Sequence, residues 1–256
     1  MNPSAEYALV KVPEVTLGFW LIKIAATTLG ETGGDAVSMS MNLDYSVATG
    51  IFAVAFLVAV NAQIRAKALY PFRYWATIIA TTTIGTTLAD FADRSLGIGY
   101  TGGSALLLAL VLLSLFLWYR SMGTVAVASV HSPKAAAFYW VTIMFSQTLG
   151  TALGDWMADT AGLGFSGTAM VFAGLLALVA AAYFWSRLSR TLLFWMAFIL
   201  TCPLGVALGD FLDRPVTVGG LALSRYWAST VLLVFILAFI LVDQVIGHLD
   251  RAFNPD

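Results

Sequence analysis

The sequence has few charged residues and one cysteine. Asp, Glu, Lys and Arg make up 11% of its 256 residues, against about a quarter in soluble globular proteins. The formal net charge of −1 argues against a nucleic-acid partner, which would need a clustered basic face. Cys202 cannot form an intrachain disulfide. We predict no cofactor, because the two histidines lie in a loop and a tail, away from Cys202.

Long apolar runs take up most of the chain. Hydrophobic residues make up 60% of the sequence, and stretches of about 20 apolar residues, long enough to span a lipid bilayer as helix, recur throughout. We therefore predict an all-α polytopic membrane protein with eight transmembrane helices. They cover approximately residues 17–40, 45–64, 73–92, 96–119, 136–158, 161–186, 191–212 and 218–242.

One motif occurs four times. An aromatic residue and a Trp are followed, ten residues after the Trp, by Gly and five residues later by Asp. The copies are Phe19, Trp20, Gly30 and Asp35; Tyr74, Trp75, Gly85 and Asp90; Tyr139, Trp140, Gly150 and Asp155; and Phe194, Trp195, Gly205 and Asp210. Such internal repetition predicts a fold built from copies of one supersecondary unit.

The spacing of the motif predicts four two-helix repeats. Successive Trp residues are 55, 65 and 55 residues apart, as expected if a helical hairpin was duplicated twice. We predict one membrane domain with two halves. Residues 1–128 hold repeats at about 17–64 and 73–121, and residues 129–256 hold repeats at about 136–186 and 191–245. Because each repeat has an even number of spans, the repeats are parallel, related by an axis along the membrane normal.

The distribution of Lys and Arg predicts the orientation. Loops after the second, fourth and sixth spans carry Arg65, Lys67, Arg73, Arg120, Lys134, Arg187 and Arg190. Loops on the other side carry Arg94 and Arg214, each directly after an Asp. By the positive-inside rule both termini are cytoplasmic, and the aromatic–Trp pairs then mark the cytoplasmic interface. Lys23, three residues from Trp20, is expected to snorkel to that interface.

Each repeated Asp lies deep in its predicted span. Fifteen residues of helix beyond the Trp give a rise of roughly 22 Å, within the outer third of a hydrocarbon core about 30 Å thick. Glu31, eleven residues after Trp20, comes near the midplane. Small residues such as Gly30 and Gly34 precede the acid and allow close helix approach, so the four motif helices are expected to meet around one axis.

These acids predict a cation site. Glu31 and Asp35 are one helical turn apart, and a carboxylate in hydrocarbon is a functional candidate by default. With Thr27 and Thr28 nearby, they supply the oxygen ligands that hard cations prefer. We predict a metal site at Glu31 and Asp35. The predicted partners from the other copies are Asp90, Asp155 and Asp210.

A second set of acids follows three or four residues later. These secondary candidates, expected at the outer interface, are Asp93, Asp159 and Asp213. A structural role is the alternative for the repeated aspartates, because Arg225 of the eighth predicted span is a candidate ion-pair partner for Asp90, Asp155 or Asp210.

The fourfold repeat with its Trp and Gly-Asp resembles a bacterial inner-membrane family defined by a tandem repeat of unknown function, the uncharacterised membrane-anchored proteins. The resemblance covers nearly the whole chain and implies eight spans in a bacterial inner membrane, without an established activity. The first copy departs from the others in having Glu31. The run from Glu31 to Asp35 also resembles the Glu-x-Gly-Asp motifs of a family of manganese and calcium transporters, with a spacing longer by one residue.

Three functions fit these patterns. We favour a small transporter or channel for a cation, with a divalent metal and proton coupling as its leading form, because carboxylates replace the water ligands that a cation loses. The alternatives are an assembly protein and an intramembrane aspartate-dependent hydrolase. In three copies the Gly-x-Gly-Asp pattern of presenilin-like proteases lacks its first Gly, which is replaced by Thr32, Ala152 and Ala207. The sequence leaves open the ion and whether the protein is a homo-oligomer.

Overall fold

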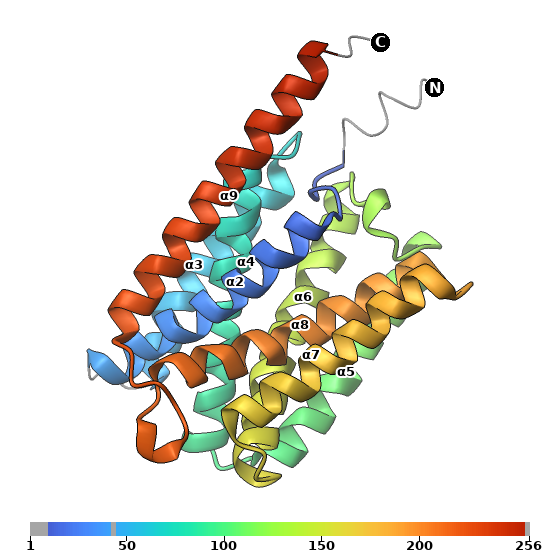
Figure 1. Ribbon diagram of the computed structural model, residues 1–256. Coiled ribbons are helices and arrows are strands. Elements are labelled where there is room, and N and C mark those ends of the chain that lie inside the picture. Colours follow the sequence, from blue (N-terminus) through green and yellow to red (C-terminus); the bar gives the residue numbers. More distant parts are fainter. Residues whose placement is uncertain (1–9, 42–44, 254–256) are drawn as a thin grey trace.

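The computed structural model describes residues 10–41 and 45–253, and these residues form helices and loops without a β-strand. Its long α-helices are α2 (Leu17–Asp35), α3 (Tyr45–Arg65), α4 (Pro71–Asp90), α5 (Tyr100–Met122), α6 (Pro133–Asp155), α7 (Gly164–Trp185), α8 (Arg190–Asp213) and α9 (Arg225–Phe253). They form the single bundle of Figure 1. The predicted all-α architecture with eight main helices is confirmed within the described part of the chain.

Local sequence signals explain several helix ends. The Thr16 hydroxyl accepts a hydrogen bond from the backbone N–H of Phe19 and caps α2, and Ser132 caps α6 in the same way before Pro133. Gly123, at φ 76°, ends α5 in the left-handed conformation that favours glycine. The eighth helix begins at Arg225 rather than near residue 218, because residues 216–218 form a short 3₁₀ turn in a loop.

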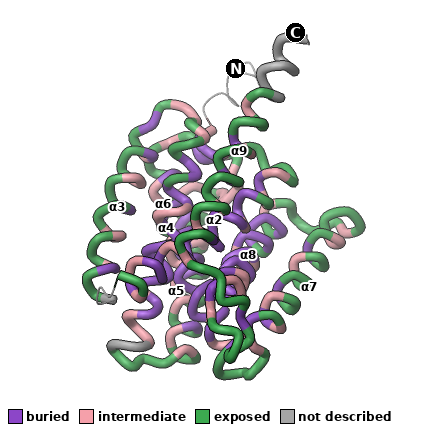
Figure 2. Tube along the Cα trace, turned by 60° about the vertical axis from the view of Figure 1, so that its left-hand side comes forward, coloured by how far each residue is buried: buried purple, intermediate pink, exposed green. Residues whose placement is uncertain are grey.

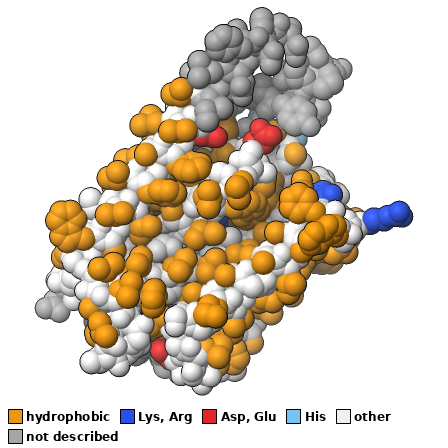
Figure 3. All heavy atoms as spheres, in the orientation of Figure 1, with side chains coloured by type: hydrophobic (Ala, Val, Ile, Leu, Met, Phe, Trp, Pro, Cys, Tyr) orange, Lys and Arg blue, Asp and Glu red, His pale blue; other side chains and the backbone are white. Residues whose placement is uncertain are grey.

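The helices differ in how apolar they are. Five of them, α3, α5, α7, α8 and α9, are long and apolar enough to cross a membrane by length and composition. The other three, α2, α4 and α6, carry the Thr residues and carboxylates of the motif and are largely buried by the rest of the bundle. The face of the molecule in Figure 3 shows hydrophobic side chains spread over the helices, and many large hydrophobic side chains of α3, α5, α7 and α9 are exposed. The structure is therefore that of a polytopic membrane protein with its polar residues inside.

The four motif helices form a closed inner ring. α2 packs on α4, α4 on α6, α6 on α8, and α8 returns to α2. Figure 2 shows that buried positions concentrate on these helices, whereas α3, α7 and α9 are mostly exposed. Residues of the first and last repeats are thus neighbours in the ring, although they are far apart in sequence.

The second helix of each repeat packs mainly on the first helix of the next repeat. α3 lies on α4, α5 on α6, α7 on α8, and α9 closes the circle on α2. In Figure 1, α9 runs beside α2. The sequence repeat is therefore not the packing unit, because each repeat covers its successor and the four interlock.

Five-residue π-helical segments continue three of the ring helices beyond their Asp. They are η1 (Ala36–Ser40), η2 (Phe91–Ser95) and η4 (Trp156–Thr160). In the fourth repeat α8 continues as α-helix to Asp213. Asp35, Asp90 and Asp155 thus lie where regular helix gives way to a wider turn, a feature often found at functional sites.

Candidate functional site

The inside of the ring is lined by residues four apart in sequence. Starting from the aromatic residue before each Trp, every fourth residue on each ring helix is buried, and the last of the five positions is the repeated Asp. Since residues i and i+4 share one helix face, each helix contributes one side chain to each of five layers. The layers are described below in order from the aromatic end to the Asp end.

The layers are named by their chemistry. The aromatic layer holds Phe19, Tyr74, Tyr139 and Phe194; the lysine layer holds Lys23, Ile78, Ile143 and Phe198; the amide layer holds Thr27, Thr82, Gln147 and Cys202; the glutamate layer holds Glu31, Thr86, Thr151 and Val206; and the aspartate layer holds Asp35, Asp90, Asp155 and Asp210. All twenty side chains are buried, with at most 8% exposure. The polarity therefore increases from one end of the axis to the other.

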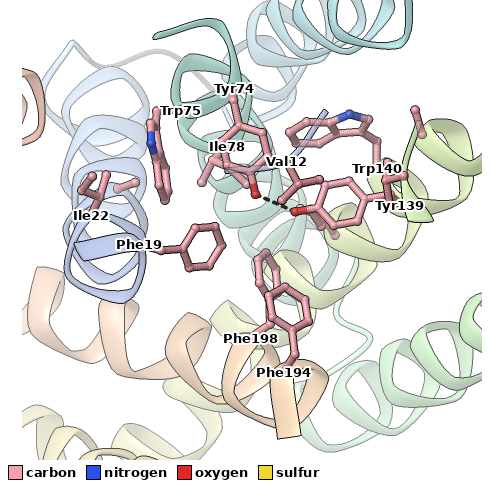
Figure 4. Close-up of a cluster of buried hydrophobic side chains, with 14 of the residues drawn as sticks. Val12, Phe19, Ile22, Tyr74, Trp75, Ile78, Tyr139, Trp140, Phe194 and Phe198 are labelled. Carbon is pink, nitrogen blue, oxygen red and sulfur yellow. Dashed lines mark hydrogen bonds between the residues drawn. The ribbon is translucent and has the colours of Figure 1, made fainter. Parts of the chain in front are cut away.

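The aromatic layer closes one end of the axis. The Tyr74 and Tyr139 hydroxyls are 2.5 Å apart, and the rings of Phe19 and Phe194 lie beside them (Figure 4). Three of the four neighbouring Trp residues are also buried, at 2–4% exposure. The aromatic–Trp pairs were expected as an interfacial belt, but they mostly fill the interior, because these positions face the ring rather than its surroundings.

Lys23 lies inside the ring, and the prediction that it snorkels to the interface is wrong. Its side chain has no exposed surface. The Nζ atom donates to Thr27 Oγ1 at 2.9 Å and to Gln147 Oε1 at 3.1 Å, and it lies 4.5 Å from the centre of the Phe198 ring. Gln147 in turn donates to Thr82. Lys23 shares a helix face with Glu31 and Asp35, so it points to the axis as they do.

Glu31 is buried at the centre of the glutamate layer. Its Oε2 atom accepts a 2.8 Å hydrogen bond from Thr86, whose hydroxyl lies 3.3 Å from that of Thr151. Its side chain is 2% exposed, and no described basic side chain lies within ion-pair distance of it. A carboxylate charge buried without a counter-ion is costly.

Three carboxylates meet between the glutamate and aspartate layers. One oxygen each from Glu31, Asp35 and Asp210 lies within 4.8 Å of the other two. Divalent cations bind oxygen at roughly 2.0–2.6 Å. Oxygens up to 4.8 Å apart can therefore bind the same ion. This carboxylate triad brings together three of the five predicted site residues, from the first and last repeats.

Two arginines cover the triad at the Asp end. Arg214 pairs with Asp210 at 2.6 Å and with Asp35 at 3.3 Å, and Arg225 pairs with Asp213 at 2.6 Å and with Asp35 at 3.8 Å. Both arginines remain partly exposed, at 16% and 20% of their side chains. Arg225 was a candidate partner for Asp90, Asp155 or Asp210, but its ion pairs are with Asp213 and Asp35, and Asp210 pairs with Arg214. The arginines thus separate the triad from the exterior.

The other predicted residues take different positions. Asp90 and Asp155 are buried in the aspartate layer on α4 and α6. The Thr27 and Thr28 hydroxyls donate to backbone carbonyls one turn earlier on α2, those of Lys23 and Ile24. Thr27 therefore contacts the lysine and not the triad.

The second acids differ in exposure. Asp159 is exposed, Asp93 is half-buried, and Asp213 is buried against Arg225. The side chain of Arg94, named above for its position after Asp93, lies outside the described residues. The three second acids are therefore not equivalent in the fold, although their sequence positions are similar.

A family model described as Repeat of Unknown Function (DUF347) matches the chain four times, at residues 18–68, 73–124, 138–189 and 193–244. Each match covers one ring helix and the helix that follows it. No curated protein and no solved structure matches the chain.

Proposed function

Because the chain belongs to the DUF347 repeat family, whose description assigns no activity, we propose from its site alone that the protein transports a small cation across a membrane. The cargo is a divalent metal ion, bound by Glu31, Asp35 and Asp210 and exchanged against protons. The membrane that we propose is a bacterial inner membrane.

The convergence of three buried carboxylates supports this proposal most directly. Their oxygens lie within 4.8 Å of one another inside a helical ring, where an uncompensated negative charge is very costly. Of these three carboxylates, Arg214 and Arg225 pair with Asp35 and Asp210 only. Glu31 has no described basic partner. A hard cation relieves this repulsion by replacing its water ligands with carboxylate oxygens, and protons relieve it when the cation leaves.

A transporter fits the packing better than an open channel. The aromatic layer fills one end of the ring, and Arg214 and Arg225 cover the triad at the other. The guanidinium of Arg214 and a metal ion compete for the negative charge of Asp35 and Asp210. Binding of the cation would therefore displace Arg214, which links occupation of the site to movement at the Asp end.

Charge at the two ends supports an orientation with both termini in the cytoplasm. The loops at the aromatic end carry exposed basic side chains, namely Arg65, Lys67, Arg73, Arg120, Lys134, Arg187 and Arg190. At the Asp end, Arg214 and Arg225 are engaged by carboxylates. The positive-inside rule then assigns the aromatic end to the cytoplasm and the arginines to the outside.

An assembly role is the second candidate, and the same arginine pairs favour it. Arg214 joins α2 to the end of α8, and Arg225 joins the start of α9 to both. In that case the acids hold the ring together and bind no cargo. Glu31 takes part in neither arginine pair. Transport predicts that a conservative change at Glu31 abolishes cation flux, whereas an assembly role predicts no cation flux to lose.

Uptake of Mn²⁺ into proteoliposomes under a pH gradient tests transport. Glu31→Gln preserves shape and the hydrogen bond from Thr86 but removes the charge, so we expect uptake to be abolished in a folded protein. Asp159→Asn removes an exposed carboxylate of α6's π-helical extension and should leave uptake unchanged. Equal uptake by wild type and Glu31→Gln, or none by wild type, would contradict the proposal.

A further inference from the structure

Lys23 occupies the axis in an environment made by all four ring helices. Thr27 of α2, Gln147 of α6 and Cys202 of α8 surround Nζ at 2.9, 3.1 and 3.6 Å. The Phe198 ring lies on one side at 4.5 Å, and α4 takes part through Thr82, which is bonded to Gln147. The amine is thus coordinated like a small cation, by neutral oxygen and sulfur atoms and an aromatic face.

Few titratable groups face this amine. Cys202 is the one in direct contact. Towards the aromatic end the next polar groups are the paired hydroxyls of Tyr74 and Tyr139, and α9 contributes apolar Ile236 and Ile240 to the core beside α2. No described carboxylate lies within ion-pair distance of Nζ.

The nearest carboxylate on the same helix face is Glu31, eight residues further along α2. An ammonium ion buried among neutral groups depends on the more distant negative charge of the carboxylate triad. A cation bound at the triad therefore disfavours the ammonium form of Lys23, because it cancels the negative potential that stabilises that form.

We propose that Lys23 carries one of the protons exchanged for the transported cation. When a divalent cation binds the triad, one N–H bond of the ammonium breaks, its electron pair stays on Nζ, and the proton passes to bulk water. When the cation leaves, Nζ takes up a proton again. This inference rests on the proposed cation transport.

The strength of the coupling follows from the geometry. Eight residues of helix separate Lys23 from Glu31 by about 12 Å. At this distance and an effective dielectric constant of about 20, a unit charge at Lys23 changes the binding constant of a divalent cation about a hundredfold. Linkage is reciprocal, so the cation binds more tightly when Lys23 is neutral and weakens protonation of Lys23 by the same factor.

Two substitutions fix the side chain at position 23 in its neutral or its charged state. Lys23→Met is always neutral, and Lys23→Arg is always charged, because a guanidinium is not deprotonated in proteins. The control is Lys67→Met, which removes an exposed lysine at the aromatic end. Binding of Mn²⁺ to the purified full-length protein is measured calorimetrically in buffers of different ionisation enthalpy, which counts the protons released per ion. Size-exclusion chromatography establishes that each variant is folded.

We expect wild type and Lys67→Met to release one proton more per Mn²⁺ than either Lys23 variant. At neutral pH, Lys23→Met should bind Mn²⁺ about a hundredfold more tightly than Lys23→Arg. If Mn²⁺ binds but both Lys23 variants release as many protons as wild type, the role of Lys23 is wrong while the cation site stands. If wild type binds no divalent cation, the proposed function fails and this inference with it.

Discussion

Gly205, in the last repeat, packs directly against Thr27, in the first. A Cβ atom at Gly205 would lie 2.5 Å from the Cβ of Thr27. Equivalent contacts join Gly30 to Thr82, Gly85 to Gln147, and Gly150 to Cys202. The motif glycine of each ring helix thus fits against the amide layer of the next, and the Gly205 contact closes the circle. This closure brings Asp210 to Glu31 and Asp35.

Replacement of Gly205 by Ala is expected to destabilise the ring. The added methyl group must push α8 away from α2, and overpacking of this kind costs about 1–3 kcal/mol. Gly174→Ala in α7 is the matched control, because its Cβ would meet nothing within 4 Å; it should be neutral or stabilising by up to about 1 kcal/mol. Thermal unfolding in detergent measures both. Equal stability of the two variants would contradict the close packing of α8 on α2.

The hydroxyl pair of Tyr74 and Tyr139 is expected to behave as a unit. Tyr74→Phe leaves the Tyr139 hydroxyl without its partner in the aromatic layer, at a cost of about 1–3 kcal/mol. The double variant with Tyr139→Phe removes both polar groups and should recover part of that loss. Tyr119→Phe, at an exposed position, should change stability by less than about 0.5 kcal/mol. Additive losses from the two single substitutions would show that the pair is not coupled.

Arg214 is expected to compete with the transported cation. Arg214→Gln leaves Asp35 and Asp210 without their shortest ion pairs, so the cation-free protein should lose about 3 kcal/mol of stability. Stabilisation by Mn²⁺ should be larger than in wild type, because no guanidinium has to be displaced. Arg190→Gln, where the exposed guanidinium stacks on Tyr183, should alter neither quantity. A smaller response to Mn²⁺ in Arg214→Gln would make Arg214 part of the site and not a competitor.

The sequence predicted the ring because its signals are local and repeated. Gly30, Gly205 and their equivalents occur at one spacing, and small residues at that spacing bring helices together. The same spacing predicted that acids from different repeats lie at similar depth, and Asp210 does reach Glu31. Packing of α3 on α4 could not be predicted in this way, because hydropathy identifies spans but not their neighbours.

The buried position of Lys23 could have been predicted from its helix face, but not from its distance along the helix from Trp20. Lys23, Thr27, Glu31 and Asp35 follow one another at intervals of four, which puts them on one face of α2. The helix face, and not the distance from Trp20, decides whether the side chain points to lipid or to the axis.

The pair of Arg214 with Asp210 is local, because the two residues are four apart, but the contacts of Arg214 and Arg225 with Asp35 had no such local signal. They depend on how the loop after α8 folds back, with the backbone N–H of Leu221 bonded to Phe211 and that of Ala222 to Arg214. These contacts bring the ends of α8 and α9 to the same carboxylates. A pattern within one repeat cannot specify them, because Asp35 lies in a different repeat.

The central claim is that Glu31, Asp35 and Asp210 bind one divalent cation, and Mn²⁺-dependent thermal stability in detergent tests it most directly. At a concentration one hundred times the dissociation constant, Mn²⁺ should stabilise wild type by about 2.7 kcal/mol. Asp159→Asn should respond equally, whereas folded Glu31→Gln should not respond. The same stabilisation of wild type and Glu31→Gln, or no response of wild type to Mn²⁺, would contradict a cation site at this triad.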